Sequence, residues 1–167
     1  MEKANHPLFN WRDLFFAAIV LVIIVADQLT KLWIRTHLFP GQVLHDYRIF
    51  QIVFVQNTGA AFGVFKGHIQ ILTIVDFIGI AVLLILFFGL RRRWSFIEKV
   101  PVVLSLGMIL GGTIGNLIDR LWLGRVTDWI DFKLWPVFNF SDASVTVGVI
   151  ILAYCLIFLA DRAKVKR

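Results

Sequence analysis

The chain has 167 residues, 59% of them hydrophobic, and its mean hydropathy is +0.80. A soluble domain of this length cannot bury so many apolar side chains, so the composition excludes a soluble globular protein. The net charge is +6, but the basic residues flank the apolar segments and form no stripe with interleaved aromatic residues. A nucleic-acid-binding function is therefore not expected.

Four apolar segments each approach or exceed the roughly 20 residues that a helix needs to cross a bilayer core about 30 Å thick. They span residues 14–35, 69–90, 101–122 and 142–160. No linker is long enough to separate a second domain, so residues 1–167 are expected to form one integral membrane domain. We predict an all-α membrane protein with four transmembrane helices and a small external β-sheet, a cradle on the membrane surface.

The first apolar segment is longer than the apolar region of a typical cleavable signal peptide, and no small-residue cleavage site follows it. We therefore expect a transmembrane helix here and not a cleavable signal peptide. It contains Asp27 and Lys31, one helical turn apart with the acid first, which is the favourable order for an ion pair. We expect this pair to orient a nearby site without reacting itself.

The external β-region is expected within residues 41–66. Residues 48–56 are rich in β-branched and aromatic side chains, and residues 42–45 form an earlier candidate strand. Small residues follow at 57–63, where the backbone can approach a ligand or another strand. Such a sheet can hold an extended peptide as an added strand; a plain hairpin that caps the bundle is the alternative.

The third apolar segment carries Gly107, Gly111 and Gly115 at four-residue spacing on one helix face. Small residues in this arrangement allow helices to approach closely in lipid. Packing along this face would bring Asn116 and Asp119 close to a neighbouring helix.

Two further residues interrupt the apolar segments. Cys155 is the single cysteine and lies within the fourth segment, so no intramolecular disulfide is expected and the residue is expected in the core. Asp76 lies within the second segment, and we expect it to reach toward the membrane surface or to be protonated.

Two aspartates, Asp128 and Asp142, bracket a short loop and lie near the ends of apolar segments. A carboxylate at a membrane boundary costs free energy, so it indicates a functional site. If the topology brings the two face to face, they should share a proton, and the ionised one can take a proton from water while the other donates to a carbonyl. The helix N-terminus weakly favours Asp142 as the ionised member, but the roles are otherwise open.

Two neighbouring carboxylates are weaker candidates. Asp131 is expected in a loop, where a solvated carboxylate costs little, and Asp119 is expected to serve a structural ion pair or the helix end. The polar residues of the apolar segments gather in the external third of the membrane. A conduction pathway needs polar residues along its whole depth, so a channel is not expected.

The distribution of Lys and Arg predicts the orientation in the membrane. Ten of the 17 basic residues lie on one side of the predicted helices. Both termini are therefore expected in the cytoplasm, and the long loop of about residues 36–68 and the short loop of about residues 122–140 are expected outside. These ten residues are Lys3, Arg12, Arg91, Arg92, Arg93, Lys99, Arg162, Lys164, Lys166 and Arg167.

Five short motifs occur in order along the chain, and their order together with the four-helix layout extends over nearly all of it. They are D-Q-L-T-K (27–31), N-T-G-A-A-F (57–62), G-G-T-I-G-N-L-I-D-R (111–120), G-R-V-T-D-W-I (124–130) and F-N-F-S-D-A-S-V-T-V-G (138–148). With these motifs the chain resembles the prolipoprotein signal peptidases (signal peptidase II), aspartic proteases of the bacterial inner membrane.

The resemblance implies that Asp128 and Asp142 are the catalytic dyad. It implies a substrate as well: a lipoprotein precursor, cut immediately before a cysteine that carries a diacylglyceryl group. The residues implied to surround the dyad and the substrate are Asp27, Lys31, Asn57, Gly59, Ala61, Gly111, Asn116, Arg120 and Asn139.

The last motif departs from the family pattern, which has Ala before the aspartate and Ser after it. This chain has Ser141 before Asp142 and Ala143 after it. The Ser141 hydroxyl is expected to bond the Asp142 carboxylate or to cap the fourth helix.

Other functions fit the sequence less well. The four histidines are scattered and no H-E-x-x-H motif occurs, so neither a metal site nor a cofactor is expected. A serine protease would need a base near Ser141 or Ser144, and Lys31 and Lys133 are the distant candidates. The alternative from another class is a proton-coupled small membrane carrier that uses Asp27, Asp76 and Asp142; a non-enzymatic scaffold is a third. We expect a monomer in membrane lipid.

Overall fold

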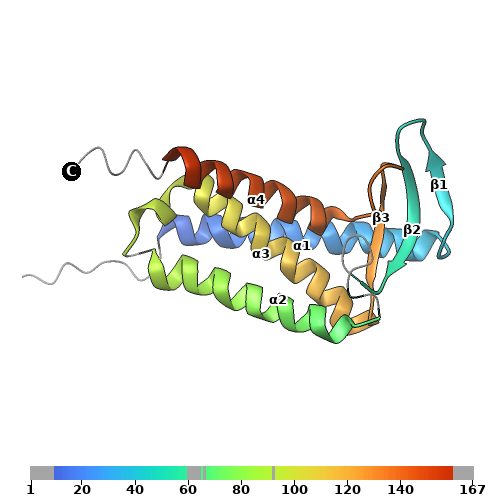
Figure 1. The fold of residues 1–167 in the computed structure, drawn as a ribbon, viewed down its shortest axis with the longest axis horizontal. Helices are drawn as coiled ribbons and strands as arrows, with labels where there is room; N and C mark the ends of the chain where they lie inside the picture. Colours follow the sequence, from blue (N-terminus) through green and yellow to red (C-terminus); the bar gives the residue numbers. More distant parts are fainter. Residues whose placement is uncertain (1–9, 60–64, 66, 92, 160–167) are drawn as a thin grey trace, which may run out of the picture.

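The computed structural model describes residues 10–59, 65, 67–91 and 93–159, which form four long helices with a small sheet at one end (Figure 1). The helices are α1 (Trp11–His37), α2 (Ile69–Leu84), α3 (Val100–Leu123) and α4 (Phe140–Leu159). A π-helical segment, Ile85–Leu90, continues α2, and a 3₁₀-helix, Ser95–Glu98, precedes α3. The four helical segments are long and apolar enough to cross a membrane, as the sequence predicts.

Helices α1 and α4 begin before the predicted apolar segments, because polar side chains complete their first turns. At the start of α1, the Asn10 side chain accepts a hydrogen bond from the Arg12 amide, and Asp13 accepts one from the Asn10 amide. This reciprocal cap satisfies N–H groups that have no partner within the helix. Helix α3 ends at Gly124, whose φ of 64° suits a residue without a side chain.

Helix α3 lies at the centre of the bundle and packs against α1, α2 and α4. Two glycines of its small-residue face, Gly107 and Gly111, lie against α1, so the predicted close helix contact is present. A Cβ atom at Gly111 would stand 2.8 Å from the Cβ of Ile23, and one at Gly107 would stand 2.9 Å from Cγ2 of Ile19. The close approach of the two helices therefore requires glycine at both positions.

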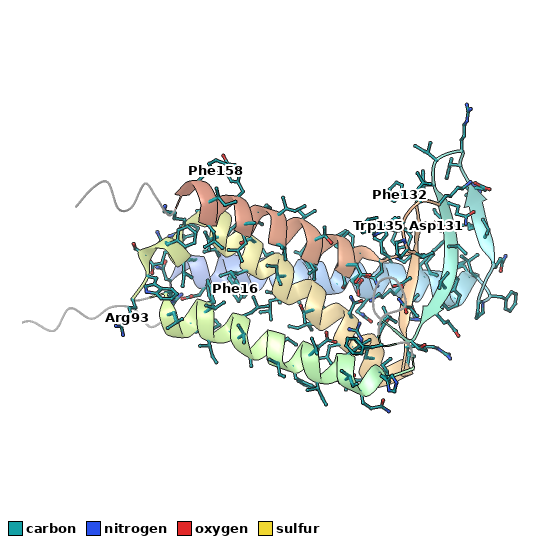
Figure 2. All side chains as sticks on the ribbon, viewed as in Figure 1. Phe16, Arg93, Asp131, Phe132, Trp135 and Phe158 are labelled. Carbon is teal, nitrogen blue, oxygen red and sulfur yellow. The ribbon has the colours of Figure 1, made fainter. Side chains whose placement is uncertain are left out.

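The core of the bundle lies at the end away from the sheet. There the rings of Phe16 and Phe87 stack with 3.8 Å between centroids, in a buried cluster that includes Val103 and Leu106. Cys155 is buried in the same cluster, as predicted. Many large apolar side chains point outward along the helices instead (Figure 2). Such a surface suits lipid and not water.

The sheet has three antiparallel strands in the order β1 (Val43–Asp46), β2 (Gln51–Asn57) and β3 (Val126–Asp131). The first two lie in the predicted β-region. The third was not predicted, because its segment was expected to be a loop. It becomes a strand by pairing with β2, where Val55 lies opposite Asp128. Phe54 of β2 packs against Ile34 and Leu38 at the end of α1, which attaches the sheet to the bundle.

Candidate active site

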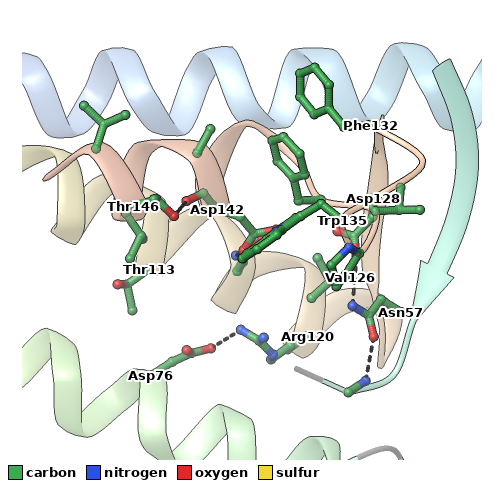
Figure 3. A pocket seen from close by; sticks show the side chains of 18 residues that line it. Asn57, Asp76, Thr113, Arg120, Val126, Asp128, Phe132, Trp135, Asp142 and Thr146 are labelled. Atoms are coloured by element: carbon green, nitrogen blue, oxygen red, sulfur yellow. Dashed lines mark hydrogen bonds and ion pairs between the residues drawn. The ribbon is translucent and has the colours of Figure 1, made fainter. Parts of the chain in front are cut away.

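A cavity of 790 Å³ lies between the sheet, α3 and α4 (Figure 3). The loop of residues 132–138 covers one side of it with aromatic and apolar groups, including Phe132 and Trp135. Among the described residues, Asp76 is the α2 side chain that lines it. The ionisable lining residues are Asp76, Arg120, Asp128 and Asp142.

Strand β3 carries Asp128 into this cavity. Successive side chains of a strand point to opposite faces, so Thr127 faces α1 and Asp128 faces the cavity. The Asp128 carboxylate is buried and accepts two hydrogen bonds. Asn57 Nδ2 donates to its Oδ2 at 2.9 Å, and Asn139 Nδ2 donates to its Oδ1 at 2.8 Å.

Asp142 lies in the first turn of α4, where Asn139 caps the helix. The Asp142 amide donates to Asn139 Oδ1 at 3.0 Å, and the Asn139 amide donates back to Asp142 Oδ2 at 3.2 Å. The other carboxylate oxygen, Oδ1, accepts a hydrogen bond from Asn116 Nδ2 at 2.7 Å. The expectation that Ser141 supplies the cap or bonds the Asp142 carboxylate is wrong, because its buried Oγ has no partner among the described residues.

Two asparagine side chains connect the two aspartates. Asn139 donates to Asp128 and accepts from the Asp142 amide, and its Nδ2 also donates to Asn116 Oδ1 at 3.0 Å. Asn116 donates in turn to Asp142. All four carboxylate oxygens thus accept a hydrogen bond from a neutral amide, and no cation lies against either carboxylate among the described residues. Neutral donors position the two groups and leave their charge free to change.

A buried cluster of charged side chains, Asp27, Lys31 and Asp119, contacts Asn116. Lys31 Nζ stands 2.8 Å from Asp27 Oδ2 and 3.5 Å from Asp119 Oδ2, and it donates to Asn116 Oδ1 at 2.9 Å. The expected Asp27–Lys31 ion pair is therefore present. Because the ammonium can only donate, it requires Asn116 Oδ1 on its own side and so directs the Asn116 NH₂ group toward Asp142.

The same cluster anchors the strand that carries Asp128. Asp119 Oδ2 accepts the Thr127 amide at 2.9 Å, and Asp119 Oδ1 pairs with Arg35 at 3.2 Å. Arg35 also donates to the Thr127 hydroxyl at 3.2 Å. The structural role expected for Asp119 is thus present, and its partners come from α1 and β3.

The environment of Asp128 favours its neutral form. Burial, followed by the nearby charge of Asp142, raises the pKa of Asp128 to about 7, although the hydrogen bonds from Asn57 and Asn139 favour the ionised form. Two carboxyls in one cavity can therefore differ in protonation near neutral pH, which acid–base catalysis requires.

Arg120 and Asp76 form an ion pair at another wall of the cavity, with 2.6 Å between Nη1 and Oδ2. Figure 3 shows this contact between the end of α3 and α2. The expectation that Asp76 reaches toward the membrane surface is wrong, because a guanidinium within the bundle pairs with it.

Comparison with known proteins adds to this geometry. The model of the signal peptidase (SPase) II family matches residues 19–158. The chain is 45% identical to the lipoprotein signal peptidase of Dehalococcoides mccartyi over 139 residues, which cover 83% of this chain and 86% of that protein. It is 36% identical to the lipoprotein signal peptidase of Halothermothrix orenii, over 88% of this chain and 96% of that one. The chain belongs to the signal peptidase II family.

Two solved structures have the same fold. Both are described as bacterial membrane enzymes; one has a TM-score of 0.76 at 27% identity and covers 90% of each chain. The other has a TM-score of 0.74 at 28% identity, over 86% of this chain and 93% of that one. This signal peptidase II is a multi-pass bacterial membrane protease, and the predicted fold class is confirmed. Nothing in these comparisons favours a carrier.

The structure brings most of the signal peptidase II motif residues together. Asn57, Gly59, Asn116 and Arg120 line the cavity. The described motif residues that do not line it are Asp27, Lys31, Gly111, Asn139 and Ser141. Gly111 packs against Ile23 of α1, and Ser141 contacts the charged cluster through its amide, which donates to Asp27 Oδ1 at 3.0 Å. Ala61 falls outside the described residues.

Several residues at the site were missed or misplaced by the sequence analysis. Arg35 was missed because it lies outside the motifs, and Asp76, noted only as a charge within an apolar segment, was not assigned to the site. Asp131 was expected in a loop but lies in β3, where it accepts a hydrogen bond from Gln51 Nε2 at 2.7 Å. It does not line the cavity.

Proposed function

We propose that Asp128 and Asp142 are the acid–base pair of an aspartic endopeptidase that removes the signal peptide from diacylglyceryl-modified prolipoproteins, cutting before the lipidated cysteine. The observation that carries this proposal is the pair of carboxylates in one cavity, each positioned by neutral amides. Family membership supports the substrate class, because the relatives are lipoprotein signal peptidases.

The two aspartates differ in ways that suggest their roles. Asp128 keeps a proton near neutral pH because burial raises its pKa to about 7. Asp142 lies in the first turn of α4, where the helix dipole and the Asn139 amide favour the anion. We therefore assign Asp128 as the acid and Asp142 as the base.

The reaction then takes two steps. Asp142 takes a proton from water as the water oxygen attacks the scissile carbonyl carbon, and Asp128 gives its proton to the carbonyl oxygen. The resulting tetrahedral diol collapses when Asp142 gives its proton to the leaving amine and Asp128 regains its own, which breaks the C–N bond. The aspartates end in their starting states.

The substrate test uses purified protein in detergent, without any gradient. A precursor peptide whose cysteine carries diacylglyceryl should be cleaved, and mass spectrometry should find the new N-terminus at that cysteine. The same peptide without lipid should react far more slowly, because burial of each acyl CH₂ contributes about 0.8 kcal/mol of binding. Comparable cleavage of both peptides, or of neither, would refute the proposal.

The rate should depend on pH in a defined direction. The pair works when Asp142 is ionised and Asp128 is protonated, so kcat/KM should fall as pH rises through about 7 and Asp128 loses its proton. Above that point the decline should approach roughly tenfold per pH unit. The profile is measured with the lipidated peptide, with protein stability followed at each pH. A rate that stays flat up to pH 9 would contradict the role of Asp128 as the acid.

We also propose that both termini are cytoplasmic and that the cavity lies near the external face of the inner membrane, in a protein that acts as a monomer. The start of α1 and the end of α4 lie at the end of the bundle away from the sheet (Figure 1), together with Arg93 (Figure 2). One chain supplies every described group of the site.

Reporter fusions test this orientation. Fusions after Arg93 and Arg167 should report a cytoplasmic location, and fusions at Gly67 and Gly124 an external one, because basic residues are retained on the cytoplasmic side. An external signal from the Arg93 fusion would overturn the orientation.

A further inference from the structure

The Asp76–Arg120 pair is the contact through which α2 reaches the cavity. Arg120 lies in the last turn of α3 and Asp76 lies within α2, and both side chains line the cavity. The side chains are 10% and 14% exposed. Charged groups at this depth are costly in a membrane, so their presence beside the cavity indicates a function beyond packing.

The pair leaves part of the guanidinium unused. Nη1 of Arg120 donates to one oxygen of Asp76, and Arg120 Nε is buried without a hydrogen-bond partner among the described residues. Arg120 Nη2 makes no hydrogen bond to the described residues either, and a guanidinium N–H at the cavity wall can gain an acceptor when a ligand binds. Arg120 is thus held at one nitrogen and has a free donor beside the cavity.

A second carboxylate–arginine pair shows the contrast. At the opposite end of the bundle, both oxygens of Asp13 accept hydrogen bonds from Arg91, and one of them also accepts the Asn10 amide. That pair joins α1 to the end of α2 with both carboxylate oxygens occupied. The Asp76 contact uses a single oxygen and a single nitrogen, so it orients the guanidinium and leaves its other N–H groups without a partner among the described residues.

We propose that Asp76 is a positioning residue, which holds Arg120 so that its free N–H groups bind a carbonyl oxygen of the substrate in the cavity. This inference rests on the proposed function. Asp76 already balances the arginine charge, so a neutral acceptor suits the site better than an anion. A carbonyl oxygen is such an acceptor, and it occurs both in the peptide backbone and in the two esters of the diacylglyceryl group.

The test compares Asp76→Asn with wild type on the lipidated peptide. Asn keeps the volume and one acceptor oxygen but loses the charge, so Arg120 is held less strongly, and KM should rise roughly tenfold, the size expected for weakening one charge-assisted hydrogen bond. The turnover number should stay within about twofold, because Asp76 contacts neither catalytic aspartate. In an Arg120→Gln background, Asp76→Asn should raise KM no further.

The matched control is Asp13→Asn, which breaks the other carboxylate–arginine pair far from the cavity. It should lower thermal stability without changing KM. An unchanged KM in Asp76→Asn, an equal KM rise in Asp13→Asn, or an additive effect in the Arg120→Gln background would overturn the proposal. If wild type does not cleave the lipidated peptide, the proposed function fails first, and the two failures are therefore distinguishable.

A second variant keeps the test decisive if Asp76→Asn does not accumulate. Asp76→Glu retains the charge but displaces the carboxylate by one methylene, so positioning predicts an intermediate KM, and wild-type KM would overturn the proposal.

A substrate with ether-linked chains, which lacks the ester carbonyls, identifies the acceptor. If the KM difference between Asp76→Asn and wild type vanishes with this substrate, Arg120 binds an ester. If it persists, Arg120 binds the peptide.

Discussion

Replacement of either Asp128 or Asp142 by asparagine is expected to abolish cleavage while the protein still accumulates in the membrane. Asparagine has nearly the same shape as aspartate, but it cannot take a proton from water or give one to the carbonyl. Loss of an acid or base should lower the rate at least 10²–10⁴-fold. The measurement is turnover of the lipidated peptide by each purified variant at matched protein amounts.

Asp131→Asn is the matched control for this pair of variants. Asp131 lies in the same strand as Asp128 and is hydrogen-bonded to Gln51, but it does not line the cavity. The variant should keep substantial activity. Asp119→Asn should mainly lower stability or yield, because Asp119 joins α1 to the strand that carries Asp128. Near-normal turnover by Asp128→Asn or Asp142→Asn would refute the proposed aspartic mechanism.

The helices and the candidate dyad could be predicted from the sequence, because their signals are local. A run of apolar residues long enough to cross a bilayer has few alternatives to a helix. The glycine spacing of α3 likewise predicts a close helix contact, and Gly107 and Gly111 make it. Carboxylates beside such runs stand out because they are costly there.

Strand β3 could not be predicted in the same way. Its six residues include two aspartates, and they form a strand through pairing with β2, which is far away in the sequence. Pairing depends on the tertiary position of β2, which local propensity does not contain. The sequence therefore located Asp128 near the membrane boundary but not on a strand.

The hydrogen-bond partners of the aspartates were also beyond the sequence. An asparagine can donate, accept or cap a helix, and only the fold decides which. Asn139 takes the capping role that was expected of Ser141, because Asn139 directly precedes α4 whereas Ser141 lies within its first turn. In the same way, Arg120 at the end of α3 determines that Asp76 forms an ion pair.

Lys31→Met should destabilise the protein strongly. The Lys31 side chain is fully buried between Asp27 and Asp119, and methionine of similar length would leave these carboxylates without the ammonium. Removal of one partner from a buried ion pair typically costs about 3–5 kcal/mol. For a domain of this size, that corresponds to a drop in the thermal midpoint on the order of 10 °C. The midpoint is measured on purified protein in detergent.

Lys133→Met is the matched control, because Lys133 pairs with Asp46 at the surface of the sheet. Exposed ion pairs contribute only about 0–1 kcal/mol, so this variant should melt close to wild type and keep its activity. Lys31→Met should in addition lose turnover below its melting range. Without the ammonium, Asn116 Oδ1 keeps only the hydrogen bond from Asn139 Nδ2, so the Asn116 amide is held less firmly in the orientation that donates to Asp142. Equal midpoints for the two variants would show that the buried cluster does not stabilise the bundle. Full turnover by Lys31→Met would show that the Asn116 orientation does not depend on the lysine.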